Sequence, residues 1–194
     1  MFETFEQRVA VAQEDVWDFW FEALSPKHWW QKEAALDQLI ARRFGDLHKQ
    51  ARAGELFAWR ETPQGRLSEI IVLDQFSRNI YRDQPQAFSQ DPQCLVLAQA
   101  AIRSGADQAV EERQRPFFYL PFMHSESMLI QDVSVQLYEQ LATDSDGRQN
   151  NLDFAQRHRV IVERFARFPH RNAQLGRAST DAEMEFLKQP GSAF

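Results

Sequence analysis

The chain has 194 residues, enough for one domain with a substantial buried core. Its net charge of -6 argues against nucleic-acid binding, and no apolar run reaches the roughly 18 residues of a transmembrane helix. The sequence shows no secretory signal, and its single cysteine, Cys94, excludes an intramolecular disulfide. We therefore expect a cytoplasmic protein with no nucleic-acid or membrane partner.

The first half of the chain reads as helices separated by glycine and proline. Apolar residues at helical spacing predict helices over residues 14–24 and 33–44, and Gly45 is expected to end the second. A long helix is predicted over 66–81; because it is apolar around much of its circumference, it should be central. Asp91-Pro92 is a helix-start signal for a further helix that ends at Arg103.

The second half continues the helical pattern. A short aromatic helix is predicted between Pro116 and Pro121, and a serine at 125 or 127 should cap a helix that runs to about Leu141. The polar stretch 143–151 reads as a loop, followed by a helix over 152–168 that Pro169 stops. Thr180 and Glu183 form a capping-box pattern that opens a last helix. The prediction is an all-α single domain over residues 1–194, made of antiparallel helix pairs.

Charged residues fall on several of the predicted apolar stripes, where they are costly unless paired or used. Asp74 and Arg78 continue the apolar line of the 66–81 helix and lie four residues apart, the spacing of an acid–base pair on one helix face. Glu126 is expected on the core-facing stripe of the following helix, near its N-terminus. A structural ion pair for the first two, and a helix cap for Glu126, remain open alternatives.

Histidines and arginines gather in the last third of the chain. His124 lies among aromatic residues and His158 on an apolar helical stripe, although each is also explained as a hydrogen-bonded core residue. Arg164, His170 and Arg171 belong to an arginine-rich segment that predicts an anion-binding wall. For Arg159 and Arg167 we prefer a solvated helix face.

The sequence predicts neither a metal site nor a specific cofactor. His124, Glu126, His158 and His170 are chemically suitable ligands, but they lack the His-Glu-x-x-His spacing of a helical zinc site. Glycine-rich phosphate loops and nucleophile elbows are likewise missing from the sequence.

Three motif stretches resemble an uncharacterised bacterial family, the domain of unknown function 924 family. They are 73–79 (LDQFSRN), 119–126 (YLPFMHSE) and 167–172 (RFPHRN). In this chain Ser77 stands where the family usually has proline, and Ala166 where it usually has glycine. The resemblance covers nearly the whole chain and implies an all-α fold similar to tetratricopeptide-repeat proteins, with diverged repeats. It implies no activity.

Three hypotheses on function follow. The first is a buried pocket for an anionic small molecule, lined by Asp74, Arg78, His124, Glu126, His158, Arg164, His170 and Arg171. The second is a hydrolase-like, metal-assisted enzyme that uses His124, Glu126 or His158 in the same pocket. The third is a scaffold that binds a protein partner, an inference from fold analogy alone. The identity of a ligand or cofactor and the oligomeric state do not follow from the sequence.

Overall fold

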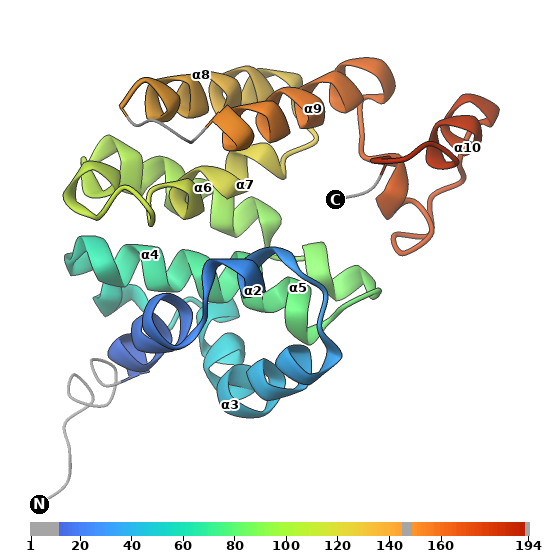
Figure 1. Cartoon of the computed structure of the whole chain (residues 1–194). Coiled ribbons are helices and arrows are strands. Elements are labelled where there is room, and N and C mark those ends of the chain that lie inside the picture. The colour runs from blue at the N-terminus through green and yellow to red at the C-terminus, as the bar shows by residue number, and fades with distance from the viewer. Residues whose placement is uncertain (1–11, 145–148, 193–194) are drawn as a thin grey trace, which may run out of the picture. The chain divides into compact units, whose positions relative to one another are not determined.

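A computed structural model describes residues 12–144 and 149–192, and in this part of the chain every regular element is helical (Figure 1). The all-α prediction is confirmed. After a first helical stretch over 12–17, the elements are η1 (Asp18–Ala23), α2 (Pro26–Trp30), α3 (Ala34–Arg52), η2 (Phe57–Glu61), α4 (Pro63–Ile71), η3 (Val72–Phe76), α5 (Ser77–Ile80), η4 (Pro85–Phe88), α6 (Asp91–Arg103), η5 (Ala106–Ala109), α7 (Pro116–Met123), α8 (Met128–Asp144), α9 (Gln149–Phe165), η6 (Pro169–Arg171) and α10 (Asp181–Leu187). Among the described residues, no helix has the length and apolar character needed to cross a bilayer.

The chain forms two compact units. The first runs to Arg82 and includes Gln86–Pro121, and the second comprises Asp83–Pro85 and the chain after Pro121. The boundary therefore falls within α7. The single-domain organisation and the tetratricopeptide-like arrangement of helix pairs stay predictions.

The core of the first unit is one helical run made of α4, η3 and α5. Every residue from Leu67 to Ser77 is buried, as expected for a helix that is apolar on most sides. α3 packs against η3 and α5, while α6 packs against α4. η3 is a π-helical turn, and such turns frequently occur at functional sites. It carries Asp74 and Gln75 in the middle of the core.

Gly45 does not end a helix, contrary to the prediction. α3 continues through it to Arg52, and its buried residues Ile40, Phe44, His48 and Ala51 recur along one face on both sides of the glycine. A glycine inside a helix costs about 1 kcal/mol relative to alanine. Burial of that continuous face outweighs the cost, so the helix persists.

The second unit is built on α8 and α9, which lie side by side and antiparallel (Figure 1). α9 ends at Phe165, three residues before the predicted end, and Ala166 then adopts a left-handed conformation with φ of 55°. This conformation explains why the resembled family favours glycine at that position. The predicted capping box is confirmed, because Thr180 Oγ1 accepts from the Glu183 backbone and Glu183 accepts from the Thr180 backbone.

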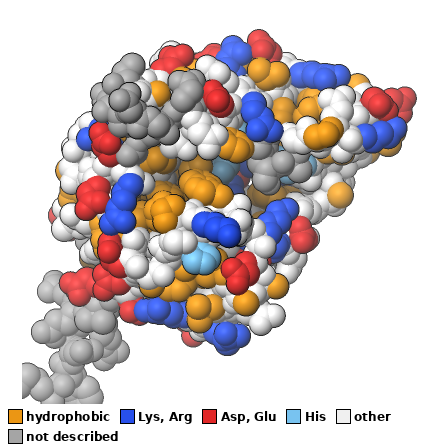
Figure 2. Space-filling view, in the orientation of Figure 1, with side chains coloured by type: hydrophobic (Ala, Val, Ile, Leu, Met, Phe, Trp, Pro, Cys, Tyr) orange, Lys and Arg blue, Asp and Glu red, His pale blue; other side chains and the backbone are white. Residues whose placement is uncertain are grey.

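The visible face carries acidic and basic side chains in alternation, with apolar side chains between them (Figure 2). This mixed surface agrees with a chain that contains 28 acidic and 22 basic side chains.

Candidate functional site

In the first unit, Asp74 and Arg78 form the predicted ion pair. Arg78 Nη1 lies 3.0 Å from Oδ1 of the buried Asp74, and Gln75 donates to Asp74 Oδ2 at 2.6 Å. Arg78 Nη2 also donates to Asp91 Oδ1 at 3.1 Å. Burial alone would lower the pKa of Arg78, but Asp74 and Asp91 outweigh that effect and raise it. The guanidinium of Arg78 is therefore engaged by two carboxylates, which favours the structural interpretation of the pair.

A second buried ion pair in the first unit was not predicted. Glu69 lies in the same helical run and is 1% exposed, and Arg60 binds it through two hydrogen bonds of 2.7 Å. The sequence did contain a signal, because Glu69 interrupts an otherwise apolar stretch. Its partner could not be predicted from helical phase, because Arg60 comes from η2, outside the helix.

In the second unit, two histidines and an arginine surround Phe168, and a third histidine lies beside one of them. The ring of His158 meets Phe168 edge to face with centroids 5.5 Å apart, and the ring of His170 lies 5.7 Å from Phe168. The guanidinium carbon of Arg171 lies 4.6 Å from the ring centroid of Phe168. The ring centroids of His124 and His158 are 6.4 Å apart. We call His124, His158, His170 and Arg171 the histidine cluster. Their convergence was part of the sequence prediction.

His158 is neutral at pH 7 and held in one orientation. Its Nδ1 donates to the Phe154 carbonyl at 2.8 Å, because a carbonyl oxygen can only accept. Burial, with smaller contributions from the nearby His124, Arg171 and His170, lowers the pKa of His158 to about 3, although the hydrogen bond to the Phe154 carbonyl acts in the opposite direction. The surroundings of His158 therefore disfavour an added positive charge.

Glu126 holds the segment around Phe168 in place. Arg177 donates to its carboxylate through Nη1 at 2.6 Å and Nη2 at 2.9 Å, and the Phe168 amide donates to Oε1 at 2.8 Å. Burial would raise the pKa of Glu126, but these hydrogen bonds lower it. Glu126 was predicted to lie on the core-facing stripe of a helix or to cap the N-terminus of that helix. Both predictions are wrong, because α8 begins only at Met128 and the carboxylate bonds to residues that follow α9.

Two further residues, Arg177 and Gln131, hold this arrangement in place, and the sequence did not predict that role for either. Arg177 also donates to Asn172 Oδ1 at 3.0 Å, so the same side chain binds both Glu126 and the segment that follows Phe168. Gln131 is fully buried and donates to the carbonyls of Met123 and Ser125 at 2.7 and 2.6 Å. It therefore fixes the turn that carries His124. An amide on the inward face of a helix was the available signal.

The other arginines of this region do not line a common wall. Arg159 bonds to Asp132 and Glu163, as expected for a helix surface. Arg167, predicted to be solvated, instead pairs with the buried Glu183 at 2.6 and 2.7 Å, so that prediction is wrong. Arg164, predicted to line a buried pocket, is exposed and stacks over Phe165 and Phe186.

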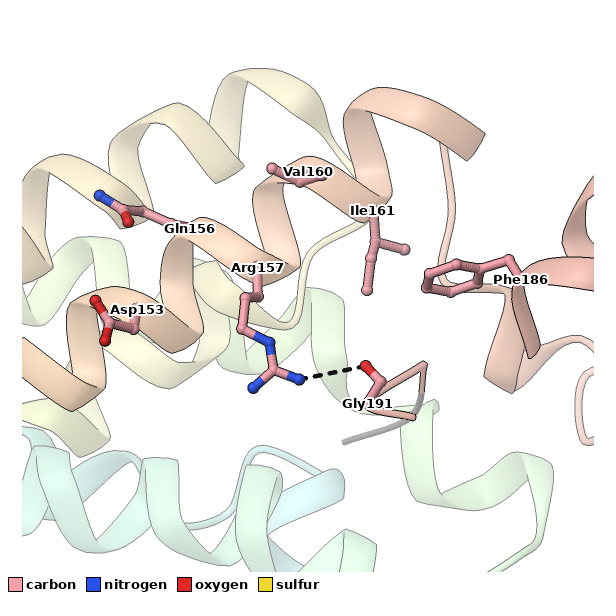
Figure 3. A pocket seen from close by; sticks show the side chains of 7 residues that line it. All are labelled: Asp153, Gln156, Arg157, Val160, Ile161, Phe186 and Gly191. Atoms are coloured by element: carbon pink, nitrogen blue, oxygen red, sulfur yellow. Dashed lines mark hydrogen bonds between the residues drawn. The ribbon is translucent and has the colours of Figure 1, made fainter. Parts of the chain in front are cut away.

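Two of the surface hollows formed by described residues of the second unit contain no member of the histidine cluster. The first, of about 370 Å³, lies between α9 and the segment that follows α10 (Figure 3). Arg157 Nη2 donates to the Gly191 carbonyl across it at 3.3 Å. The second, of about 550 Å³, is lined by Arg164 and Glu183 among others. Because both hollows are open to solvent, we base the candidate site on the histidine cluster.

No group of three histidine, cysteine or acidic side chains in the described ranges is arranged to hold a metal ion. The cluster offers nitrogen donors from imidazoles and a guanidinium. That donor set suits an anion better than a cation.

Comparisons with known proteins agree with this structure and supply no activity. A solved structure from Agrobacterium tumefaciens, described as that of the protein of unknown function ATU0120, is 41% identical in sequence with a TM-score of 0.86; the match covers 93% of this chain and 98% of that one. No curated protein matches the chain. The family model described as bacterial protein of unknown function (DUF924) matches residues 16–191. The chain therefore belongs to this family.

Proposed function

We propose that the second unit binds a small anionic molecule at the histidine cluster. The observation that supports this most directly is the burial of Arg171, only 6% exposed, against Phe168 in the company of three imidazoles. A guanidinium on an aromatic face beside several ring N–H groups is suited to carboxylate, phosphate or sulfate.

The burial of the four residues gives the site an outer and an inner part. His124 and His170 are half-buried, whereas His158 and Arg171 are buried. An anion that enters past the half-buried pair would leave water for an environment of low dielectric constant, where its attraction to Arg171 is stronger than at the surface.

The Glu126–Arg177 pair supports the site without needing to touch the ligand. It anchors the Phe168 amide, and Arg177 also donates to the Phe168 carbonyl at 3.2 Å. Phe168 is the ring against which Arg171 stacks. The pair therefore acts through the position of the segment that carries His170 and Arg171.

Asp74 and Arg78 were expected in the same pocket and belong to the first unit. A shared pocket with the histidines stays a prediction, and the proposal does not require it. The hydrolase-like alternative would have to use His124 as the base, because Glu126 is engaged by Arg177 and His158 is too weak a base at neutral pH.

Thermal unfolding with and without sulfate tests the proposal, with sodium chloride at matched ionic strength as the reference. A ligand present at about 100 times its Kd stabilises the folded protein by about 2.7 kcal/mol. Arg171→Lys keeps the charge but loses the forked donor, so it should lose most of this stabilisation. Arg159→Lys, on the helix surface, should keep it. Equal stabilisation of both variants, or none of the unmodified protein, would refute the proposal.

A further inference from the structure

We propose that the groove between α9 and α10 binds a short, acidic, amphipathic helical segment of a partner protein. The groove joins the two surface hollows described above, and we call it the α9–α10 groove. One of its walls is α9, and the other is α10 with the segment that follows it. Neither hollow contains a member of the histidine cluster, so this inference does not depend on the proposed function.

The two hollows form one continuous surface. Phe186 lines the first hollow and Phe165 lines the second, and their rings are in contact with centroids 5.0 Å apart. On α9, Arg157, Val160 and Arg164 recur at steps of three and four residues, so they share one face of the helix. The lining positions of α9 run from 153 to 165, about 18 Å at about 1.5 Å per residue. This length suits a short peptide segment.

The first hollow supplies the apolar part of the groove. Ile161 and Phe186 point toward one another across it (Figure 3), and Val160 beside them is 56% exposed. Phenylalanine and arginine are both enriched at the centres of protein–protein interfaces. An amphipathic helix that lays its apolar face into such a groove is a recurring mode of peptide recognition.

Arg164 supplies the charge that selects an acidic partner. Its guanidinium carbon lies 4.7 Å from the ring centroid of Phe165 and 5.8 Å from that of Phe186. Stacking on aromatic rings uses the faces of the guanidinium, whereas its N–H donors lie around the edge. Asp153 also lines the groove, but it lies about three helical turns from Arg164.

The acids closest to Arg164 along α9 and α10 are engaged by other arginines. Glu163 binds Arg159 at 3.1 Å, and Glu183 binds Arg167 at 2.6 Å. Among the described residues, no carboxylate forms an ion pair with Arg164. A carboxylate from a partner would therefore complete this pair, and its charge would complement the groove.

The α10 wall is held in place without a partner. Arg167 donates to both carboxylate oxygens of the buried Glu183 and to the Ala178 carbonyl, the last at 2.9 Å. Thr180 caps the N-terminus of α10. Because these contacts fix the wall before a partner arrives, binding does not incur the cost of ordering it.

Fluorescence anisotropy with a labelled probe peptide tests the inference. The probe is a helical peptide of about 12 residues with leucines along one face and glutamates beside them, and a control probe has lysine in place of each glutamate. We expect saturable binding of the glutamate probe, about tenfold tighter than that of the lysine probe and weakened by added salt.

Two matched variants locate the binding surface. Arg164→Ala and Arg159→Ala each remove one guanidinium from α9, but only Arg164 lines the groove. Arg164→Ala should weaken binding of the glutamate probe about tenfold, whereas Arg159→Ala should change it by less than about twofold. Val160→Asp adds a charge to the apolar wall at an exposed position, so it should fold and also bind about tenfold more weakly.

Several results would overturn the inference. They are equal binding of the two probes, equal losses for the two alanine variants, or no binding of the glutamate probe to the folded protein. Self-association of the protein that Arg164→Ala abolishes would also overturn it, because the occupant would then be a second copy of this chain.

Discussion

Replacing Glu126 with glutamine removes the charge that Arg177 and the Phe168 amide share, while it preserves the shape of the side chain. The carboxylate accepts three hydrogen bonds of 2.6 to 2.9 Å, two of them from a guanidinium. Both side chains are about three-quarters buried, with 28% and 25% exposed. Hydrogen bonds to charged groups contribute about 1.5–3 kcal/mol each when buried. Allowing for partial exposure, we expect the substitution to destabilise the protein by about 2–3 kcal/mol in total.

The effect should depend on pH with a defined sign. The pKa of Glu126 is lower in the folded protein than in the unfolded chain, where it is about 4.3. The stabilisation is therefore complete above pH 5 and disappears as the pH falls through the folded pKa.

Thermal unfolding followed by circular dichroism at 222 nm measures the effect. At pH 7 the loss should lower Tm by about 5–10 °C. Glu163→Gln is the matched control, because Glu163 pairs with Arg159 at the surface with 57% of its side chain exposed. It should cost less than about 0.5 kcal/mol. A Glu126→Gln loss as small as that of the control, or one that is unchanged at pH 3.5, would show that the pair does not hold this segment.

Three further predictions concern backbone conformation and a buried histidine. Ala166→Gly should raise the free energy of unfolding by about 0.5–1 kcal/mol, because the residue has φ of 55°; a lower Tm would contradict this. Gly191→Ala and Gly176→Ala should each cost about 1 kcal/mol by urea denaturation, because both residues have positive φ; the added methyl at 191 would lie 2.6 Å from Arg157 Nη2, but that is the end of a flexible side chain that can move away, so a much larger loss at 191 would contradict this. Burial and the nearby Arg52 lower the pKa of His48 to about 4, so its contribution to stability is complete above pH 6.5 and falls between pH 6.5 and 4 as the unfolded chain takes up the proton first. His48→Gln should flatten urea-denaturation stability over that range, and an unchanged slope would exclude His48 as its source.

The fold followed from the sequence because its helices depend on local periodicity and on capping residues. The Asp74–Arg78 pair was predictable for the same reason, since both residues lie on one helical run. The helix end predicted at Gly45 is wrong, because burial of the helix face on both sides of this residue outweighs the local cost of one glycine.

The candidate site was only partly predictable. His158 could be placed on an inward face from its helical phase, and it is indeed 5% exposed. The partners of Glu126 could not be identified, because Phe168 and Arg177 lie 42 and 51 residues further along the chain. Arg167 was misjudged for the same reason, since Glu183 approaches it from α10. Helical phase gives the direction of a side chain and not the segment that meets it.

The sequence distance spanned by Glu126 and Arg177 has a consequence for how the protein is made. During synthesis, Glu126 leaves the ribosome 51 residues before its partner. Until Arg177 emerges, the carboxylate has neither its guanidinium nor a fixed Phe168 amide, and the contacts that close such a long loop form slowly. The histidine cluster should therefore be among the last parts of the chain to reach its final form during translation.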